Sequence, residues 1–402
     1  MKIAGIIAEY HPFHNGHAWQ IGRLREMGWD AVVCVMSTGA VQRGELELLP
    51  ARLRARAALL GGADLVIGLP APYACKSAEG FAQAGVWLLE ALGCVDTLCF
   101  GTEDADAEAL TRAAMVLEGA AFRVKLREKL DAGLPLPAAR AQAAEALLPG
   151  AKALLSRPNQ ILGVDYCRAL LHLKSRMQPL ALRRIGRGHD ETGVAQRDGR
   201  RYASASQLRA ALLQGSARAL EACVPQACFP IYCQAQEQGL LLDGRAVSLA
   251  VLSRLRAMPP AGFAAVRGAG EGLAERLYAA SRQAGCLDDL LERLKTKRYP
   301  TARLRRLILD AALGYTDALP ARPPYLHVLG ATERGRELLG QAAPRLPMGA
   351  GLAKLERMNE ACGAVARAEA AAQDLAALCR QSPQPCGQAF TGKFLFEKVQ
   401  RA

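Results

Sequence analysis

The first hundred residues alternate between short, continuous apolar runs and longer segments with helical periodicity. The apolar runs predict strands covered on both faces, and the periodic segments predict helices between them. Repeated strand–helix–strand order predicts a parallel sheet with helical crossovers, an open doubly wound α/β fold of Rossmann-like type. The expected strands are 2–8, 31–36, 64–70 and 95–101, and the expected helices are 15–27, 51–62 and 77–93.

The pattern changes further along the chain. Residues 105–155 predict helices with polar loops, and a helix over 161–174 and a strand over 179–185 follow. A last helix of this part, over 204–215, starts with a serine in the N-cap position. Beyond it the periodicity is helical, interrupted by proline and glycine pairs. We therefore expect a Rossmann-like domain over 1–215 and a mainly helical domain over 216–402.

Composition adds a strong positive charge to this picture. The 402 residues carry a formal net charge of +13, which favours a polyanionic partner such as nucleic acid over a role in solubility alone. No apolar stretch approaches a membrane span or a signal peptide, so we expect no membrane and a cytoplasmic protein with reduced cysteines. The five-residue spacing of Cys223, Cys228 and Cys233 does not fit a usual zinc site, and no metal ligand is assigned.

Candidate chemistry lies in the segment "EYHPFHNGHAWQ", residues 9–20. It joins the first expected strand to the first expected helix, at the carboxyl edge where open α/β sheets bind ligands. A helix N-terminus suits phosphate, and the imidazoles of His14 and His17 can donate hydrogen bonds as charge grows at phosphorus. Gly16 permits close approach of a nucleotide, and Pro12 stiffens the turn. The alternative is two exposed histidines at a helix cap.

The chain resembles a known superfamily at this point. His14-Asn15-Gly16-His17 is similar to the H-x-G-H signature of adenylyl-transferring nucleotidyltransferases, which class I aminoacyl-tRNA synthetases share. "SASQLR", from Ser204 to Arg209, resembles a second element of that superfamily, which implies contact with the β- and γ-phosphates of ATP.

An ordered set of motifs over residues 1–340 narrows the resemblance to the bacterial tRNA(Met) cytidine acetate ligase family. The motifs are "GIIAEYHPFHNGH", "VQRGE", "GADLVIGLP", "SAEGFA", "FGTE", "RPNQILGVDY", "RRIGRGHDE", "SASQLR", "KRYPTARLRRLIL" and "PPYLHVLGATERGRELL". The resemblance implies that acetate is activated with ATP as acetyl-adenylate. The acetyl group then passes to N4 of the wobble cytidine in elongator methionine tRNA.

The resemblance also implies site residues. His14 and His17 are the expected catalytic residues. The expected ATP site comprises Ile7, Ala8, Glu9, Tyr10, His11, Pro12, Phe13, His14, Asn15, Gly16, His17, Gln20, Gly101, Asn159, Arg184, Ile185, Ser204 and Arg209. Gly101 and Arg184 also fall at expected strand ends, whereas Asn159 fits a helix N-cap equally well. Mg²⁺ is expected with ATP because it neutralises the triphosphate.

A basic segment over 291–306 is the second candidate site. It contains seven lysines and arginines against one acid, with a tyrosine among them. Such a cluster gives salt-sensitive binding to phosphates, and an aromatic ring can stack on an unpaired base. The alternative is a solvated helix face. The expected tRNA contacts are Lys297, Arg298, Tyr299, Arg303, Arg305 and Arg306.

Several positions depart from the family pattern, and we expect them to lie around the catalytic face. They are His11, Thr38–Ala40, Pro50–Ala51, where a lysine is missing that Arg52 could replace, and Gly68. Two alternative functions therefore remain open. One is an adenylyltransferase acting on a small phosphorylated metabolite, and the other is a catalytically weakened RNA-binding relative.

Overall fold

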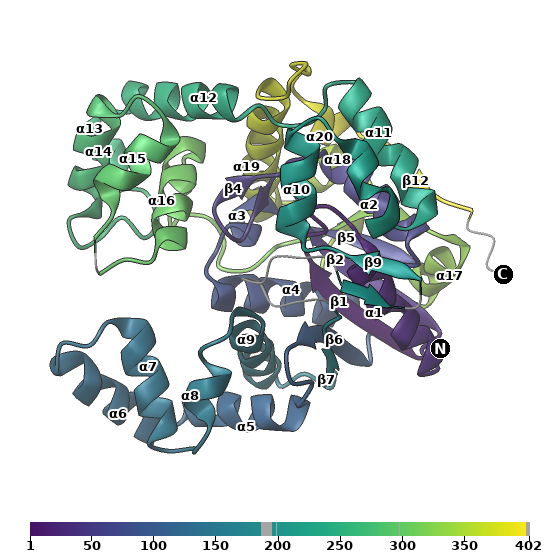
Figure 1. The fold of residues 1–402 in the computed structure, drawn as a ribbon, viewed down its shortest axis with the longest axis horizontal. Coiled ribbons are helices and arrows are strands. Elements are labelled where there is room, and N and C mark those ends of the chain that lie inside the picture. The colour runs from purple at the N-terminus through teal and green to yellow at the C-terminus, as the bar shows by residue number, and fades with distance from the viewer. Residues whose placement is uncertain (186–194, 198, 297, 399–402) are drawn as a thin grey trace.

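The computed structural model describes residues 1–185, 195–197, 199–296 and 298–398. Its centre is a mixed sheet whose main path has the strand order β11-β10-β5-β2-β1-β6-β7, with β12 beside β10 (Figure 1). All neighbouring pairs are parallel except β10 and β5, which run antiparallel. The strands are β1 (Ile3–Ala8), β2 (Ala31–Ser37), β5 (Leu65–Leu69), β6 (Thr97–Thr102), β7 (Gln178–Arg183), β10 (Leu326–Ala331), β11 (Met348–Gly349) and β12 (Leu395–Phe396).

The predicted doubly wound fold is confirmed. Each predicted strand corresponds to an observed one, and the order β5-β2-β1-β6-β7 reverses direction at β1, where open sheets form a ligand crevice. The helices predicted before residue 216 are also present. They are α1 (Asn15–Glu26), α2 (Ala51–Leu60), α4 (Ala78–Leu92), α5 (Ala107–Glu118), α6 (Ala120–Asp131), α7 (Leu136–Glu145), α8 (Ala151–Leu154), α9 (Pro158–Leu173) and α10 (Ala205–Leu213).

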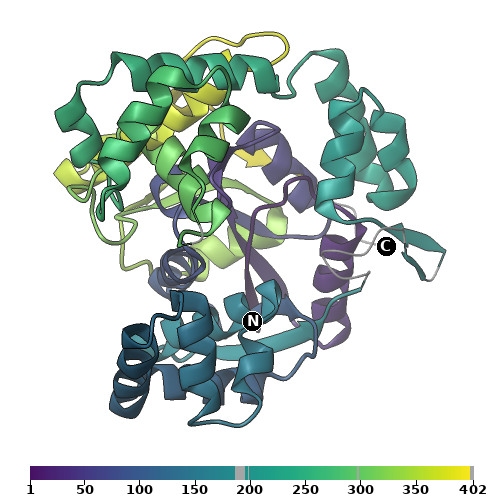
Figure 2. The ribbon, with the colours of Figure 1, turned by 60° about the vertical axis from the view of Figure 1, so that its left-hand side comes forward.

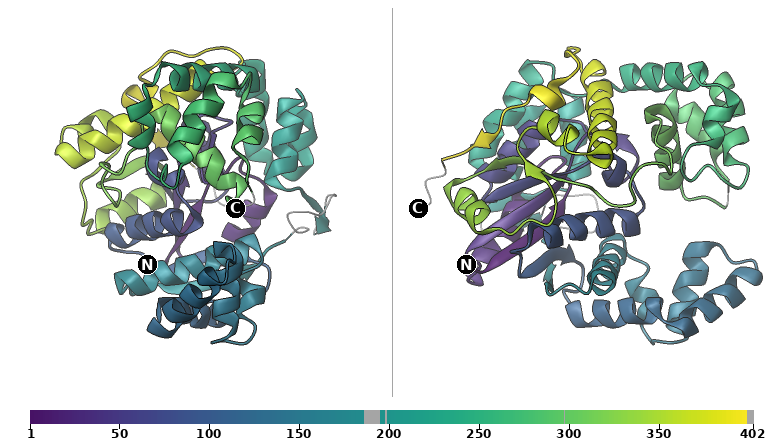
Figure 3. Two further views of the ribbon diagram at one scale, coloured as in Figure 1. Left: turned by 90° about the vertical axis from the view of Figure 1, so that its left-hand side faces the viewer. Right: turned by 180° about the vertical axis from the view of Figure 1, so that it is seen from behind.

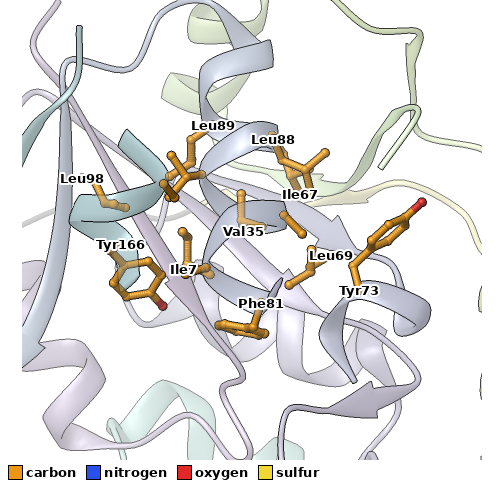
Figure 4. Packing of buried hydrophobic residues seen from close by; sticks show 14 of the residues in the cluster. Ile7, Val35, Ile67, Leu69, Tyr73, Phe81, Leu88, Leu89, Leu98 and Tyr166 are labelled. Carbon is orange, nitrogen blue, oxygen red and sulfur yellow. The ribbon is translucent and has the colours of Figure 1, made fainter. Parts of the chain in front are cut away.

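Helices cover both faces of the sheet because alternate strand residues point to opposite sides. On one face, Ile7, Val35 and Ile67 from three adjacent strands pack with Leu88 and Leu89 of α4 (Figure 4). On the other face, side chains of the same strands pack against α1 and α2. The continuous apolar runs of the sequence therefore correspond to strands that are buried on both faces.

The chain beyond residue 215 is mostly helical, as predicted, but part of it belongs to the sheet. The six residues of β10 are all buried, and the strand pairs antiparallel with β5 and parallel with the short strands β11 and β12. The apolar run in "YLHVLGA" carries the same signal as the N-terminal strands, and only its position among helices obscures it. The division of the chain at residue 215 into ATP-binding and tRNA-binding parts stays a prediction.

Helices α12 to α16 form a separate group beside the sheet, which Figures 2 and 3 show from other sides. Their apolar side chains share a core with α3 and α19. A hairpin of two short strands, β3 (Ala40–Val41) and β4 (Glu45–Leu46), contacts this group through α16. The helices after residue 215 are α11 (Phe229–Glu237), α12 (Gly244–Ala257), α13 (Pro260–Ala264), α14 (Leu273–Gln283), α15 (Leu287–Leu294), α16 (Thr301–Leu313), α17 (Glu333–Gln341), α18 (Leu352–Glu356), α19 (Glu360–Leu378) and α20 (Gln388–Thr391).

The remaining elements are short. They are α3 (Ala71–Ala74), the hairpin of β8 (Ala195–Arg197) and β9 (Arg200–Tyr202), and the 3-10 helices η1 (Ala217–Cys223) and η2 (Gln226–Cys228). Within the described ranges, no helix combines the length and apolar character that a membrane span requires.

Candidate active site

Buried aromatic rings hold the turn between β1 and α1 in place. Tyr10 and Phe13 are 1% and 0% exposed, and the Tyr10 hydroxyl lies 3.1 Å from Cys34 Sγ of β2. Tyr10 has a φ of 45°, a left-handed conformation that is uncommon for an aromatic residue and typical of functional turns. Arg54 of α2 also donates a hydrogen bond of 2.6 Å to the carbonyl of Glu9. These contacts fix the backbone that carries the two histidines.

Segments far along the chain hold the same turn from the other side. Asn15 donates through Nδ2 to the carbonyls of Arg201 and Ala222, at 2.9 and 3.0 Å. The Tyr232 hydroxyl of α11 donates to the carbonyl of Phe13 at 2.7 Å. The turn is therefore held between the sheet and elements on both sides of α10 in the chain, namely β9, η1 and α11.

The imidazoles of His14 and His17 are oriented by backbone N–H groups. His14 is the N-cap of α1, and its Nδ1 accepts a 3.0 Å hydrogen bond from the N–H of Gly16. His17 Nδ1 accepts from the N–H of His14 at 3.3 Å, and the two rings stack with centroids 3.8 Å apart. Because each Nδ1 accepts a hydrogen bond, the proton of each neutral ring lies on Nε2.

Burial keeps both rings neutral. Burial lowers the pKa of His14 to about 3, and the nearby Arg184 guanidinium acts in the same direction. Burial also lowers the pKa of His17 well below its usual value, and His14 and Arg184 add to this shift. At neutral pH the pair therefore supplies two Nε2–H donors without positive charge.

A cavity of about 280 Å³ opens beside the turn, beyond the carboxyl ends of β1, β6 and β7. Residues that directly follow these strands line it, namely Glu9, Glu103 and Arg184. A smaller cavity of about 40 Å³ lies against both histidines and against Gly101 of β6. His14 and Gly16 line both spaces. The turn therefore borders two cavities at the carboxyl edge of the sheet.

One wall of the larger cavity is a chain of polar side chains. Arg184 Nη1 donates to Asn159 Oδ1 at 3.3 Å, and Asn159 Nδ2 donates to Glu103 Oε1 at 2.8 Å. The N-cap of α9 is Arg157. The N-cap alternative for Asn159 is therefore wrong, and its carboxamide instead links a cation to a carboxylate within the cavity wall.

The N-terminus of α10 also lines the larger cavity. Ser204 caps this helix by accepting from the N–H of Gln207 at 3.3 Å. Arg209 donates to the carbonyl of His11 at 3.0 Å and to Ser206 Oγ at 3.0 Å. The helix end and a guanidinium thus meet the histidine turn, an arrangement that favours bound anions.

The structure brings most of the predicted ATP-site residues together, though not all of them. Those lining the two cavities are Glu9, His11, His14, Gly16, His17, Gln20, Gly101, Asn159, Arg184, Ile185, Ser204 and Arg209. Ile7, Tyr10 and Phe13 have their side chains in the hydrophobic core, with Ala8 packed against it. Asn15 is occupied with its two carbonyl partners, and Pro12 is buried within the turn. These six shape the turn, and their side chains do not line the two cavities that the described residues form.

The larger cavity also has lining residues that sequence reasoning did not select. They include Arg43, Glu45, Glu103, Tyr202 and Gln207. The sequence motifs did mark four of these residues. Arg43 and Glu45 belong to "VQRGE", Glu103 belongs to "FGTE", and Gln207 lies within "SASQLR".

The predicted tRNA contacts divide into two groups. The guanidinium groups of Arg298 and Arg303 lie 5.5 and 4.6 Å from the ring centre of Tyr299, which is only 9% exposed. Tyr299 therefore does not present a free face for stacking on a base. Its hydroxyl donates to Glu271 at 2.9 Å. Lys297 lies outside the described residues.

The other two arginines among the predicted tRNA contacts face the β3–β4 hairpin. Arg305 forms an ion pair of 2.6 Å with Glu45, and Arg306 donates to the carbonyl of Gln42 at 3.2 Å. A Cβ atom at Gly44 would lie 2.4 Å from the backbone nitrogen of Arg306. The basic segment thus attaches α16 closely to the hairpin.

Most departures from the family pattern do not line the two cavities, although we expected them around the catalytic face. Thr38 is buried and donates to Glu369 at 2.9 Å, and a Cβ atom at Gly68 would contact Thr38 and His327. Ala51, the first residue of α2, is 4% exposed and follows the N-cap Pro50. Arg52 is not among the residues lining the two cavities in the described part of the chain.

His11 is the departure that does reach the site. It is 4% exposed, and its Nε2 accepts from the N–H of Leu48 at 2.7 Å. Burial lowers its pKa well below the usual value, and Arg54, Arg209 and Arg380 act in the same direction. His11 is therefore neutral, with its proton on Nδ1.

Known proteins resemble this chain over most of its length. A family model described as HIGH Nucleotidyl Transferase matches residues 1–387. A protein of Acetivibrio thermocellus named tRNA(Met) cytidine acetate ligase is 32% identical, over 97% of this chain and 99% of its own. The protein of the same name from Syntrophotalea carbinolica is 35% identical, over 88% and 86%.

Solved structures show the same likeness. Thermotoga maritima TmcAL bound with alpha-thio ATP is 27% identical and superposes with a TM-score of 0.88, covering 99% of this chain and 100% of that chain. Its apo form gives a TM-score of 0.90 at 28% identity, with the same coverage. The H-x-G-H turn, the nucleotidyltransferase sheet and the full-length relatives agree, and the chain belongs to the tRNA(Met) cytidine acetate ligase family.

Proposed function

We propose that this protein is an ATP-dependent acetate ligase that acetylates N4 of the wobble cytidine of elongator tRNA(Met) through acetyl-adenylate. Relatives that cover nearly the whole chain carry the name tRNA(Met) cytidine acetate ligase. TmcAL, which shares the fold, binds an ATP analogue. The observation that carries the proposal is the neutral His14–His17 pair at the N-terminus of α1 beside a cavity rich in arginine.

In the first step, an acetate oxygen attacks the α-phosphorus of ATP, and the bond to pyrophosphate breaks. Negative charge then grows on the α-phosphate oxygens and on the leaving pyrophosphate. The Nε2–H groups of His14 and His17 donate to the α-phosphate, because fixed donors stabilise charge that is greatest in the transition state. Arg209 and the N-terminus of α10 hold the β- and γ-phosphates.

In the second step, the acetyl-adenylate is the donor for the cytidine of a bound tRNA. The positive charge of the chain and the arginines at the start of α16 support a polyanionic partner. In this proposal, Arg298 and Arg303 contact tRNA phosphates, because they are 67% and 40% exposed. Arg305 and Arg306 position α16 against the hairpin.

Mg²⁺ is proposed to arrive with the triphosphate. Three glutamates line the larger cavity, but the described residues contain no group of three or more acidic, histidine or cysteine side chains that could hold a metal ion. A cation that keeps several waters and binds mainly to substrate phosphates fits such a site.

Release of pyrophosphate from ATP tests the proposal against its alternatives. We expect release that depends on acetate and produces acetyl-adenylate. Release that instead depends on a phosphorylated metabolite would favour the small-metabolite adenylyltransferase. An absence of release in protein that binds tRNA would favour the weakened RNA-binding relative.

A further inference from the structure

A third cavity, of about 350 Å³, lies between the β3–β4 hairpin and helices α10, α12, α15 and α16. In Figure 1, β4 lies between α16 and α10. The walls of this third cavity are largely apolar and include Leu46, Leu213, Val247, Val251, Leu291 and Ile308. Of the predicted ATP-site residues, His11 and Arg209 line this cavity and the others do not.

This cavity adjoins the larger cavity beside the histidine turn. His11, Glu45 and Arg209 line both spaces. His11 has its proton on Nδ1, because Nε2 accepts from Leu48, and Arg209 contacts the His11 carbonyl. A carboxylate, an imidazole N–H and a guanidinium thus stand where an apolar space meets a space for phosphates.

The basic segment also contributes to the walls of this cavity. Arg305 of α16 lines the cavity and pairs with Glu45, whose side chain is 39% exposed. Arg303 lies two residues earlier on α16, near the cluster of Arg298 and Tyr299. A nucleotide whose phosphates contact this end of α16 could therefore direct its base through the cavity toward the turn.

We propose that this cavity receives the acceptor cytosine of the tRNA, with Glu45 contacting its exocyclic amine. The inference rests on the proposed function and names the acceptor subsite of that reaction. RNA-binding proteins read unstacked bases in apolar pockets through hydrogen bonds to their Watson–Crick edges. A carboxylate accepts from the N4 amine of cytosine, and Arg305 or His11 can donate to its N3 and O2. Uracil, with O4 in place of the amine, would face the Glu45 carboxylate with an acceptor.

The position of Glu45 also suits the transfer step. The N4 lone pair attacks the acetyl carbonyl carbon, and a C–N bond forms. The bond between the carbonyl carbon and the phosphate oxygen breaks, and its electron pair leaves with AMP. N4 loses one proton, which Glu45 accepts and passes to water. General-base help of this kind contributes roughly 100-fold or more.

Filling the cavity tests its role. Val247 lies on α12, lines the cavity and is half-buried, so Val247→Trp places a ring in the proposed base site. We expect acetyl transfer to tRNA to fall at least 10-fold while acetate-dependent pyrophosphate release stays within 2-fold. Leu249→Trp is the matched control on the same helix, because Leu249 is 57% exposed and does not line the cavity. Leu213→Trp, at a 52% exposed position on the rim, gives a second filling variant if Val247→Trp does not fold.

Replacing the carboxylate separates chemistry from structure. Glu45→Gln is expected to slow acetyl transfer from preformed acetyl-adenylate to tRNA about 100-fold, with an unchanged Kd for tRNA. Arg305→Gln breaks the same ion pair but keeps the carboxylate, so it is expected to weaken tRNA binding and to retain most of the transfer rate at saturating tRNA.

The outcomes distinguish this inference from the function on which it rests. If the parent protein releases no pyrophosphate with acetate, the proposed function itself fails. If it does, and both filling variants transfer acetyl groups at the parental rate, the cavity is a packing gap and the inference is overturned. Loss of pyrophosphate release in a folded filling variant would also overturn it, because the cavity would then serve ATP or acetate. Equal losses in Glu45→Gln and Arg305→Gln would assign the effect to the ion pair.

Discussion

The imidazole rings of His14 and His17 stack with centroids 3.8 Å apart, and each ring accepts a backbone N–H through Nδ1. The signature histidines are therefore parts of the helix cap as well as candidate ligands of phosphate. This relationship explains why they lie three residues apart, since an N-cap side chain and its third helical residue can satisfy each other's backbone groups. It leaves both Nε2–H groups as donors.

Removing one of these donors should affect the reaction far more than the fold. We expect His17→Ala to lower the rate of acetate-dependent pyrophosphate release by about 100- to 1000-fold, because it deletes a donor to a developing oxyanion. The lost cap interaction should cost only about 1 kcal/mol of stability. Steady-state kinetics with a thermal melt measures both. A folded variant with the parental rate would remove His17 from the mechanism.

The low pKa of His14 predicts a pH-dependent contribution to stability. The unfolded state binds a proton to this residue below about pH 6.5, whereas the folded state does so only near pH 3, so stability is lost as the pH falls between these values. The shift corresponds to about 2 kcal/mol between pH 7 and pH 5. The cost of His14→Gln, measured by urea unfolding, should therefore be smaller at pH 5 by about that amount. A cost that does not change with pH would show that His14 titrates normally.

We expect Asn15 to contribute only by holding the histidine turn in place. Asn15→Ala leaves the carbonyls of Arg201 and Ala222 without their donor, which should lower the free energy of unfolding by about 1–3 kcal/mol. Because the clamp holds the turn, we also expect a higher KM for ATP with a smaller change in kcat. Asn15→Asp keeps the size but removes both donors, so it should be at least as damaging. A loss below about 0.5 kcal/mol in both variants would contradict the clamp.

The exposed arginines of the basic segment should control the salt dependence of tRNA binding. Replacing Arg298 and Arg303 together with Gln should flatten the slope of log K against log salt by roughly two units, about one for each lost phosphate contact. Pyrophosphate release without tRNA should persist. Arg112→Gln with Arg345→Gln removes two exposed charges elsewhere and should leave the slope unchanged. Equal slopes in both double variants would indicate a solvated helix face.

The fold was predictable where the local pattern carries the structure. Val33 and Val35, for example, lie in an apolar run that becomes a strand buried on both faces. The run around Leu329 carries the same signal, but it lies among helices, and antiparallel pairing with a strand more than 250 residues away leaves no local trace. Long-range pairing is a tertiary property.

The site was predictable where one motif supplies it. His14, Gly16 and His17 follow from strand–turn–helix logic, and the structure places them at the cavities. The burial of Tyr299 and the absence of Ala51 and Gly68 from the cavity walls depend on tertiary packing, which periodicity alone does not specify. The motif "VQRGE" marks Arg43 and Glu45 in the sequence, but only the packing of the hairpin shows that they line the larger cavity.

The most direct test of the central claim follows the acetyl group itself. The protein is incubated with labelled acetate, ATP and unmodified elongator tRNA(Met), and the tRNA is digested to nucleosides for mass spectrometry. We expect one labelled N4-acetylcytidine per tRNA, with AMP and pyrophosphate formed in equal amounts, and none of these products when ATP is omitted. The proposed function is contradicted if the tRNA stays unlabelled while the folded, active protein releases pyrophosphate only with a different acceptor.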